Sequence, residues 1–183
     1  IFCEYRDKRS FPLLLPLLDQ PCPVERMSAV YALGRNPCPK AVQKLVCLLE
    51  TDDNAYVRRA TAWSLANYDN QIVLEPLINA LKNDVAAVRL WSSSSLAEIG
   101  NVSLENAQLA AEQLLVSLKI DNESGVRSNC IWSLCRLYQK LNNSFQESFI
   151  DECTKIALFD KEPSVMEEAK TALDSMGMQG FYN

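Results

Sequence analysis

The sequence predicts an all-α fold, an α-solenoid (α–α superhelix) of about five helical hairpins. A short amphipathic segment, which reads AYVRRATAWSLAN between Ala55 and Asn67, recurs five times in altered form. Its anchoring leucine returns at intervals of 32, 31, 38 and 39 residues, at Leu33, Leu65, Leu96, Leu134 and Leu173. The composition, with 48% hydrophobic residues and only 5 glycines, suits a continuous helical core. A period of this length indicates stacked repeats.

Each repeat is expected to contain two helices, helix A followed by helix B, joined by a tight turn. Neither helix can bury its apolar stripe alone, so neighbouring hairpins must stack. A single array is predicted over residues 1–177, followed by a C-terminal tail at residues 178–183. Its hairpins are expected at about residues 11–36, 39–70, 71–101, 104–141 and 145–177.

The first three hairpins differ in their prolines. The first contains four prolines and is expected to have the shortest helices. In the second, helix A is predicted over about residues 40–50, where apolar residues share one face, and helix B begins near Val57. In the third, Pro76 is expected in the first turn of helix A or at a kink, and helix B begins near Val88.

The last two hairpins are longer. Helix A and helix B are predicted at about residues 104–119 and 124–140 in the fourth hairpin, and at about residues 145–159 and 163–176 in the fifth. In the fifth hairpin, Glu167 and Glu168 replace the basic residue that opens the other helices B. An irregular last repeat is typical of the end of an array.

An acidic or amide residue stands four positions before the first valine of helix B in three hairpins. These residues are Asp53, Asp84 and Asn122. Side chains of this type accept hydrogen bonds from the first amides of a helix. We therefore expect them to cap helix B.

The charge pattern disfavours binding to nucleic acid. Residues 1–92 carry 11 basic and 10 acidic residues and residues 93–183 carry 7 and 13, which together give the net charge of −5. Nucleic-acid binding needs clustered cations, whereas the excess here is acidic. No apolar run approaches the ~18 residues that cross a membrane, so we predict a soluble protein with no membrane partner.

Residue types for catalysis and metal binding are few. The sequence has no histidine, no glycine-rich phosphate loop and no nucleophile elbow. Its seven cysteines include no C-x-x-C pair, so no metal site is expected, and unpaired thiols fit a reducing compartment. We therefore expect no catalytic residue and no cofactor.

The D-x-x-x-V-R spacing from Asp53 to Arg58 and from Asp84 to Arg89, followed by A-x-x-A-L-like helices, resembles the HEAT-repeat family. In that family the Asp and the Arg are structural and link the turns of adjacent repeats. The resemblance implies this ladder role for all four residues. Arg127 keeps the basic position in the fourth hairpin, but its partner Asp is missing there and the fifth hairpin has neither residue. The ladder is therefore expected to weaken toward the C-terminus.

Within that family, three short segments look like the HEAT-like repeats of phycobiliprotein lyase subunits and their relatives in cyanobacteria and plastids. The segments are Ala29–Gly34, Pro39–Val42 and Val88–Trp91. That subfamily includes bilin lyases, which work as two-subunit complexes, and non-lyase adaptors, one type being associated with iron–sulfur scaffold proteins. The resemblance implies a location in the cytoplasm or the plastid stroma.

The inner, concave face of helices B is the candidate binding surface. On an ideal helix of 100° per residue, the core side of the second helix B holds Val57, Ala60, Thr61, Ser64 and Leu65. The opposite side holds Arg59, Ala62, Trp63 and Ala66. The position of Trp63 in the five successive hairpins is occupied by Tyr31, Trp63, Ser94, Trp132 and Thr171.

Two interpretations of Trp63 and Trp132 remain open. They complete the core between neighbouring helices B, or they form a binding stripe, because aromatic anchors dominate interface energetics and the concave surface of a solenoid is its usual binding surface. Arg35, Arg59 and Arg136 would flank such a stripe and suit a carboxylate or propionate.

The same helical positions predict where two further side chains lie. Trp91 falls nearer the flank of the core and is expected to pack there. Cys135 matches the position of Ala66 on the inner face beside Trp132. If one thiol has a function, we expect it to be Cys135, because reactivity needs exposure and a lowered pKa.

We therefore expect a non-catalytic protein-interaction scaffold or adaptor that contacts its partner through Tyr31, Arg59, Trp63, Ser94, Trp132, Cys135 and Arg136. One alternative is a subunit of a heteromeric bilin lyase or isomerase acting on phycobiliproteins, with a bilin in the groove. A second alternative is an adaptor for iron–sulfur assembly proteins. The expected partner is a protein, for which the resemblance suggests a phycobiliprotein or a second HEAT-like subunit.

Overall fold

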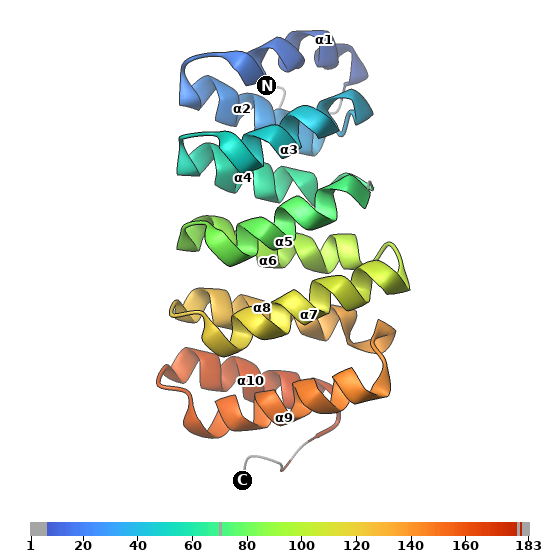
Figure 1. Ribbon diagram of the computed structural model, residues 1–183, viewed down its shortest axis with the longest axis vertical. Helices are drawn as coiled ribbons and strands as arrows, with labels where there is room; N and C mark the ends of the chain where they lie inside the picture. The colour runs from blue at the N-terminus through green and yellow to red at the C-terminus, as the bar shows by residue number, and fades with distance from the viewer. Residues whose placement is uncertain (1–6, 70, 179, 181–183) are drawn as a thin grey trace. The chain divides into compact units, whose positions relative to one another are not determined.

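The computed structural model describes residues 7–69, 71–178 and 180 (Figure 1). These residues form ten α-helices, short 3₁₀ turns and no β-strand, so the predicted all-α solenoid class is confirmed. The chain divides into two compact units, Ile1–Ile99 and Gly100–Asn183. We call them the N-terminal unit and the C-terminal unit and describe each on its own. In the described part of the chain, no helix has the length and apolar character needed to cross a bilayer.

The helices of the N-terminal unit alternate between helix A and helix B, as predicted. Helices B of this unit pack side by side, α2 against α4, and the intervening α3 packs on both α4 and α5. A hydrogen bond of 2.8 Å from Ser95 Oγ to the carbonyl of Ala62 joins α6 to α4. The bounds of the helices are α1 (Phe11–Leu14), α2 (Pro23–Arg35), α3 (Val42–Thr51), α4 (Ala55–Leu65), α5 (Leu74–Asn83) and α6 (Ala86–Gly100).

The core side of α4 agrees with the helical periodicity. All five residues expected to face the core, from Val57 to Leu65, are buried. Ala62 was expected on the opposite side but is also fully buried, and its carbonyl accepts the hydrogen bond from Ser95 of α6. Pro76 is the third residue of α5, in the first turn, where a missing N–H leaves no helical hydrogen bond unmade.

The C-terminal unit contains two longer hairpins. Its helices are α7 (Leu104–Ile120), α8 (Ser124–Leu137), α9 (Asn143–Phe159) and α10 (Pro163–Ser175). Helix α7 packs on α8 and α9 packs on α10, while α8 and α10 contact each other as neighbouring helices B. The apolar side of α9 places the ring of Phe149 in the core, fully buried. Trp132 of α8 is exposed at the surface of this unit.

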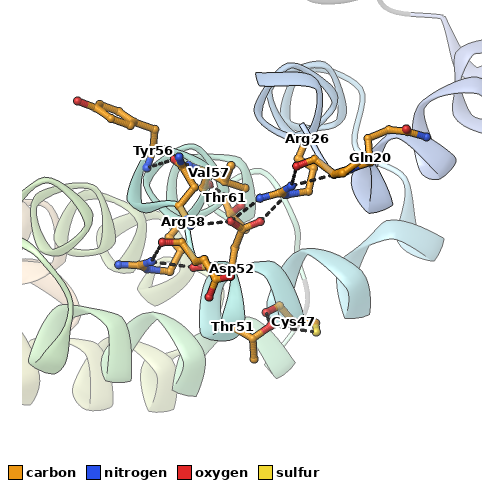
Figure 2. A network of polar contacts seen from close by, with 12 residues as sticks. Gln20, Arg26, Cys47, Thr51, Asp52, Tyr56, Val57, Arg58 and Thr61 are labelled. Carbon is orange, nitrogen blue, oxygen red and sulfur yellow. Dashed lines mark hydrogen bonds and ion pairs between the residues drawn. The ribbon is translucent and has the colours of Figure 1, made fainter. Parts of the chain in front are cut away.

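Arginine–aspartate pairs join the turns of successive hairpins in the N-terminal unit. Figure 2 shows the first of these pairs, between Arg26 and Asp52. Arg26 donates from Nε and Nη2 to the two carboxylate oxygens of Asp52, at 2.7 and 2.9 Å, and from Nη1 to the carbonyls of its own turn. Arg58 binds Asp84 in the same bidentate way, both distances being 2.7 Å. Each guanidinium therefore ties the turn before its own helix to the turn of the next hairpin.

The same pair occurs in the C-terminal unit. Arg127 donates to both oxygens of Asp160, at 3.1 and 2.7 Å, and its Nη1 donates to the carbonyls of Asp121 and Asn122. The side chains of Arg127 and Asp160 are only 6% and 10% exposed. The expectation that the ladder weakens toward the C-terminus is therefore wrong. Asp160 stands six residues before Met166, as Asp52 stands six before Arg58.

Asp53 does not have either of its expected roles. Its carbonyl accepts a hydrogen bond from Arg58, but the ladder carboxylate of this turn belongs to Asp52, and the cap of α4 is Asn54, which accepts from the amides of Tyr56 and Val57. The two turns differ in length, because Asp52 precedes Arg58 by six residues, whereas Asp84 precedes Arg89 by five. Counting back from the arginine therefore selected the wrong residue in the longer turn.

The expected cap at Asn122 is also absent. The N-cap of α8 is Glu123, and its side chain makes no capping hydrogen bond. Asn122 contributes its carbonyl to Arg127, and Asp121 accepts from the amide of Glu123. Asp84 accepts from the amide of Val85 at 2.7 Å in addition to binding Arg58, and Arg89 donates to its carbonyl.

Candidate functional site

Helices B of the N-terminal unit bring aromatic and basic side chains together on one side. Tyr31 and Arg35 are four residues apart on α2, and Arg59 and Trp63 are four apart on α4, so each pair shares a helix face. Packing of α2 against α4 places the rings of Tyr31 and Trp63 at a centroid distance of 5.4 Å with a tilt of 54°. This geometry is that of a favourable aromatic pair.

A glycine makes this close arrangement possible. A Cβ atom at Gly34 would lie 2.6 Å from Cζ3 of Trp63 and 3.1 Å from the Cα of Ser64. The indole of Trp63 therefore lies directly over the backbone of α2. Trp63 is half-buried by this contact and keeps part of its ring at the surface. The ring completes the packing of two helices B, as the first interpretation from the sequence expects, and it also lines a pocket. Its role in a binding stripe stays a prediction.

The pocket has a volume of about 410 Å³ and is lined by Tyr31, Arg35, Arg59, Trp63 and Trp91. Its residues come from α2, α4 and α6, the three helices B of the N-terminal unit. Trp91 was expected to pack against the core, but it is 36% exposed and forms one wall. The helical wheel missed it because the wheel places Cβ atoms, whereas the indole extends several ångströms beyond its own Cβ.

The two arginines of the pocket are held by aromatic rings. The guanidinium carbon of Arg35 lies 5.7 Å from the centroid of Trp63, and that of Arg59 lies 5.6 Å from the centroid of Tyr56. Arg59 Nη2 also donates a long hydrogen bond of 3.4 Å to the hydroxyl of Tyr31. These cation–π contacts orient both positive charges without neutralising them.

A second, smaller cluster lies on α8 in the C-terminal unit. Trp132 is 41% exposed, and the guanidinium carbon of Arg136 lies 5.0 Å from the centroid of its ring. Cys135 is half-buried on the same helix. The cluster therefore repeats the pairing of a surface tryptophan with an arginine that Trp63 and Arg35 show on the N-terminal unit.

Cys135 is not an activated thiol. Burial raises its pKa to about 11, the negative charge of Glu168 acts in the same direction, and a hydrogen bond with Ser175 opposes them. A thiol with this pKa is protonated at neutral pH and is a poor nucleophile. Among the described residues, no group of three or more His, Cys, Asp or Glu side chains is arranged to hold a metal ion.

The residues expected at the binding face are thus distributed over two places. Tyr31, Arg59 and Trp63 meet in the pocket of the N-terminal unit. Ser94 is half-buried on α6 and is not among the residues that line this pocket. Trp132, Cys135 and Arg136 lie on α8 of the C-terminal unit. Arg35, which was expected to flank the stripe, lines the pocket with the first group, and the structure adds Trp91 to this group.

Solved structures of repeat proteins resemble the whole chain. A chain from the complex of CpcE and CpcF of phycocyanin lyase from Nostoc sp. PCC7120 is 24% identical with a TM-score of 0.68, over 91% of this chain and 99% of that chain. A designed armadillo repeat protein in complex with the peptide (KR)4 is 20% identical with a TM-score of 0.63, over 100% of this chain and 89% of that chain. At these identities the similarity shows a common fold.

An engineered protein of known structure is 25% identical with a TM-score of 0.65, over 89% of this chain and 79% of that chain. No curated protein matches the chain. The family model that matches is that of HEAT repeats, at residues 1–66 and 42–135. Together the two matches cover 135 of the 183 residues. With this coverage, and with stacked hairpins joined by arginine–aspartate pairs, the chain belongs to the HEAT-repeat family.

Proposed function

We propose that the protein is a non-catalytic scaffold that binds a partner protein on the face formed by its helices B. The observation that carries the proposal is the pocket of the N-terminal unit, where three aromatic rings and two arginines converge. Tyrosine, tryptophan and arginine are the residues enriched at the energetic centres of protein interfaces. In a repeat protein, a surface built from equivalent helices is the usual binding surface.

The C-terminal unit contributes a second contact under this proposal. Trp132 and Arg136 form an exposed pair on its helix B, with Cys135 between them in the sequence. Ser94 on α6 is a further contact. The proposed surface thus contains all the partner-binding positions expected from the sequence, including the flanking Arg35, together with Trp91.

The structural comparisons support partner binding as a function of this fold. One similar chain is solved in a two-component complex, that of CpcE and CpcF, and another is solved with a bound peptide. Partner binding by repeat proteins of this shape is therefore the simplest use of the face described above. From the family resemblance, we propose a location in the cytoplasm or the plastid stroma.

The test is affinity capture from source-cell extract with the wild-type chain and two variants. Arg35→Glu reverses an exposed charge of the pocket, and Gln43→Ala changes an exposed residue of α3 on the helix-A side. We expect Arg35→Glu to lose specific partners and Gln43→Ala to retain them, with equal melting temperatures for the three proteins. Retention of the same partners by Arg35→Glu, with loss by Gln43→Ala, would overturn the proposal.

A second candidate function is that of a bilin lyase or isomerase subunit. It is favoured by the match that extends over 99% of a chain in the phycocyanin lyase complex. The two pocket arginines would suit the propionates of a tetrapyrrole. An absorbance spectrum of the captured material separates the candidates. Bilin absorbance with a phycobiliprotein or a second repeat subunit supports the lyase, whereas colourless eluate with other proteins supports the scaffold, including an adaptor of iron–sulfur assembly.

A further inference from the structure

The two arginines of the pocket differ from the arginines of the ladder in their charge partners. Arg26, Arg58 and Arg127 each bind a carboxylate with two hydrogen bonds. Within the described residues, neither Arg35 nor Arg59 has a carboxylate within ion-pair distance, and their contacts are with aromatic groups. The pocket thus presents two positive charges that the protein does not neutralise, although the chain as a whole is acidic with a net charge of −5.

Arg59 also carries a buried polar atom without a hydrogen-bond partner. Its Nε is inaccessible to solvent and unpaired, while its Nη2 makes only the 3.4 Å contact with Tyr31. An unpaired buried donor on a charged group reduces stability. This unpaired group belongs to a residue that lines the pocket, where an anion bound to the outer nitrogens of the guanidinium would compensate the charge.

The shape of the pocket specifies more than an anion. A volume of about 410 Å³ exceeds what one carboxylate group occupies, and the remaining walls are the rings of Tyr31, Trp63 and Trp91. An occupant that satisfies both kinds of wall has a carboxylate next to an apolar side chain. Planar carboxylates suit guanidinium groups because they accept two parallel hydrogen bonds.

We propose that this pocket binds an acidic segment of the partner protein, with an Asp or Glu carboxylate between Arg35 and Arg59 and a neighbouring apolar side chain against Trp63 and Trp91. This inference rests on the proposed scaffold function and names the chemistry of its partner. Charge complementarity decides the sign of the segment, because a Lys or Arg side chain would meet two like charges.

The test is an NMR titration of the full chain with three unlabelled peptides, EELEE, QQLQQ and KKLKK. The indole N–H signals of the three tryptophans report the site, and Trp132 of the C-terminal unit is an internal control. We expect EELEE to shift the signals of Trp63 and Trp91 and to leave Trp132 unchanged. QQLQQ and KKLKK are expected to bind at least about tenfold more weakly, since charge-assisted hydrogen bonds are lost.

Matched variants assign the binding to the two arginines. Arg35→Gln and Arg59→Gln are expected to weaken EELEE binding about tenfold each, and Lys82→Gln, which removes an exposed positive charge of α5 that does not line the pocket, is expected to have no effect. Arg35 is exposed, so Arg35→Gln gives an answer even if Arg59→Gln fails to fold. Equal binding of EELEE and QQLQQ, or unchanged binding in Arg35→Gln, would overturn the inference.

Two further outcomes separate this inference from the proposed function. If capture of partners depends on Arg35 but EELEE does not bind, the face is correct and the acidic segment is wrong. If EELEE binds at Trp63 and Trp91 but capture is unaffected by Arg35→Glu, the pocket chemistry stands and the partner-binding face is wrong. Binding of a free bilin at these two tryptophans without binding of EELEE would replace the peptide by a small-molecule carboxylate.

Discussion

At the scale of single residues, Gly34 decides how closely α2 and α4 approach at the pocket. A Cβ atom there would come within 3.1 Å of the backbone of Ser64 and 2.6 Å of the Trp63 ring. Backbone atoms cannot yield as a flexible side chain can, so the helices would have to move apart. The packing of the aromatic pair and the shape of the pocket therefore depend on this position.

Gly34→Ala is expected to destabilise the protein by about 1–3 kcal/mol through overpacking, although alanine is the better helix former. Urea unfolding followed by circular dichroism measures the change. Gly125→Ala, at an exposed position of α8, is the control and is expected to be neutral or stabilising by up to about 1 kcal/mol. A Gly34→Ala variant as stable as the wild type would show that the helices separate freely.

Tyr68 joins the end of α2 to the following turn. Its hydroxyl donates to the carbonyl of Leu33 at 3.1 Å and accepts from the amide of Cys38 at 3.4 Å, and the residue is 4% exposed. Tyr68→Phe leaves both backbone groups without this partner and is expected to cost about 1–3 kcal/mol. Urea unfolding at pH 8 measures the loss, and an unchanged midpoint would contradict it.

The same residue predicts an alkaline limit of stability. Burial raises the pKa of Tyr68 to about 12, although its hydrogen bond with Cys38 acts in the opposite direction. Because the folded state holds the proton more tightly, the stabilisation is complete below pH 10 and is lost as the pH rises toward 12. The wild type should therefore lose more stability than Tyr68→Phe over this range, and parallel losses in the two proteins would contradict the assignment.

At the scale of elements, the arginine–aspartate ladder links the turns that begin successive helices B. Each guanidinium contacts two turns at once, so the pair constrains the distance between hairpins as well as the local turn. The partners are mostly buried, which makes each pair costly to break from one side.

Asp160→Asn is expected to cost about 3–5 kcal/mol, because Arg127 would retain a buried charge without its counter-ion. Chemical denaturation monitored by circular dichroism measures this loss. Asp151→Asn, an exposed carboxylate on α9, is the matched control and is expected to change stability by less than about 0.5 kcal/mol. Equal losses of stability in the two variants would show that the pair of Arg127 and Asp160 does not stabilise the fold.

The ladder also predicts sensitivity to acid. Burial alone would raise the pKa of Asp52 and Asp160, but hydrogen bonds from Arg26 and Arg127, backbone amides and nearby positive charges outweigh it and lower both pKa values below 3.8. A lowered folded-state pKa means that the stabilisation is present above pH 3.8 and disappears as the pH falls through the lower folded values. Thermal melting between pH 6 and pH 2 should show a smaller loss in Asp160→Asn than in the wild type.

The ladder shows what the sequence could and could not predict at this scale. The arginines were identified because Val-Arg opens helix B at Arg58, Arg89 and Arg127. Asp84 was identified correctly as a ladder carboxylate. Asp53 was chosen in place of Asp52, and Asp160 was missed, because turns of two lengths separate the Asp from the Arg and a spacing rule taken from one length fails for the other. Counting six residues back from the arginine position of helix B, which Arg58 and Met166 occupy, would have found Asp52 and Asp160.

At the scale of the whole molecule, the period of the anchoring leucines was sufficient to predict a helical repeat fold. Periodicity is a property of the backbone and of which side of a helix is apolar, so it predicted the helices and the core side of α4 correctly. The pocket was only partly predictable. Its volume depends on how far the Trp91 ring extends from α6 and on the close approach of α2 and α4 at Gly34, and neither is a periodic feature.

The central claim is that a partner binds the helix-B side of this protein. Site-specific photo-crosslinking tests it most directly, with a benzophenone amino acid at Ala66, at the end of α4 one turn beyond Trp63, or at Gln43 on α3. In source-cell extract, the account predicts a discrete crosslinked partner from position 66 that Arg35→Glu abolishes, and none from position 43. The same partner crosslinked from position 43 and not from position 66 would contradict the claim.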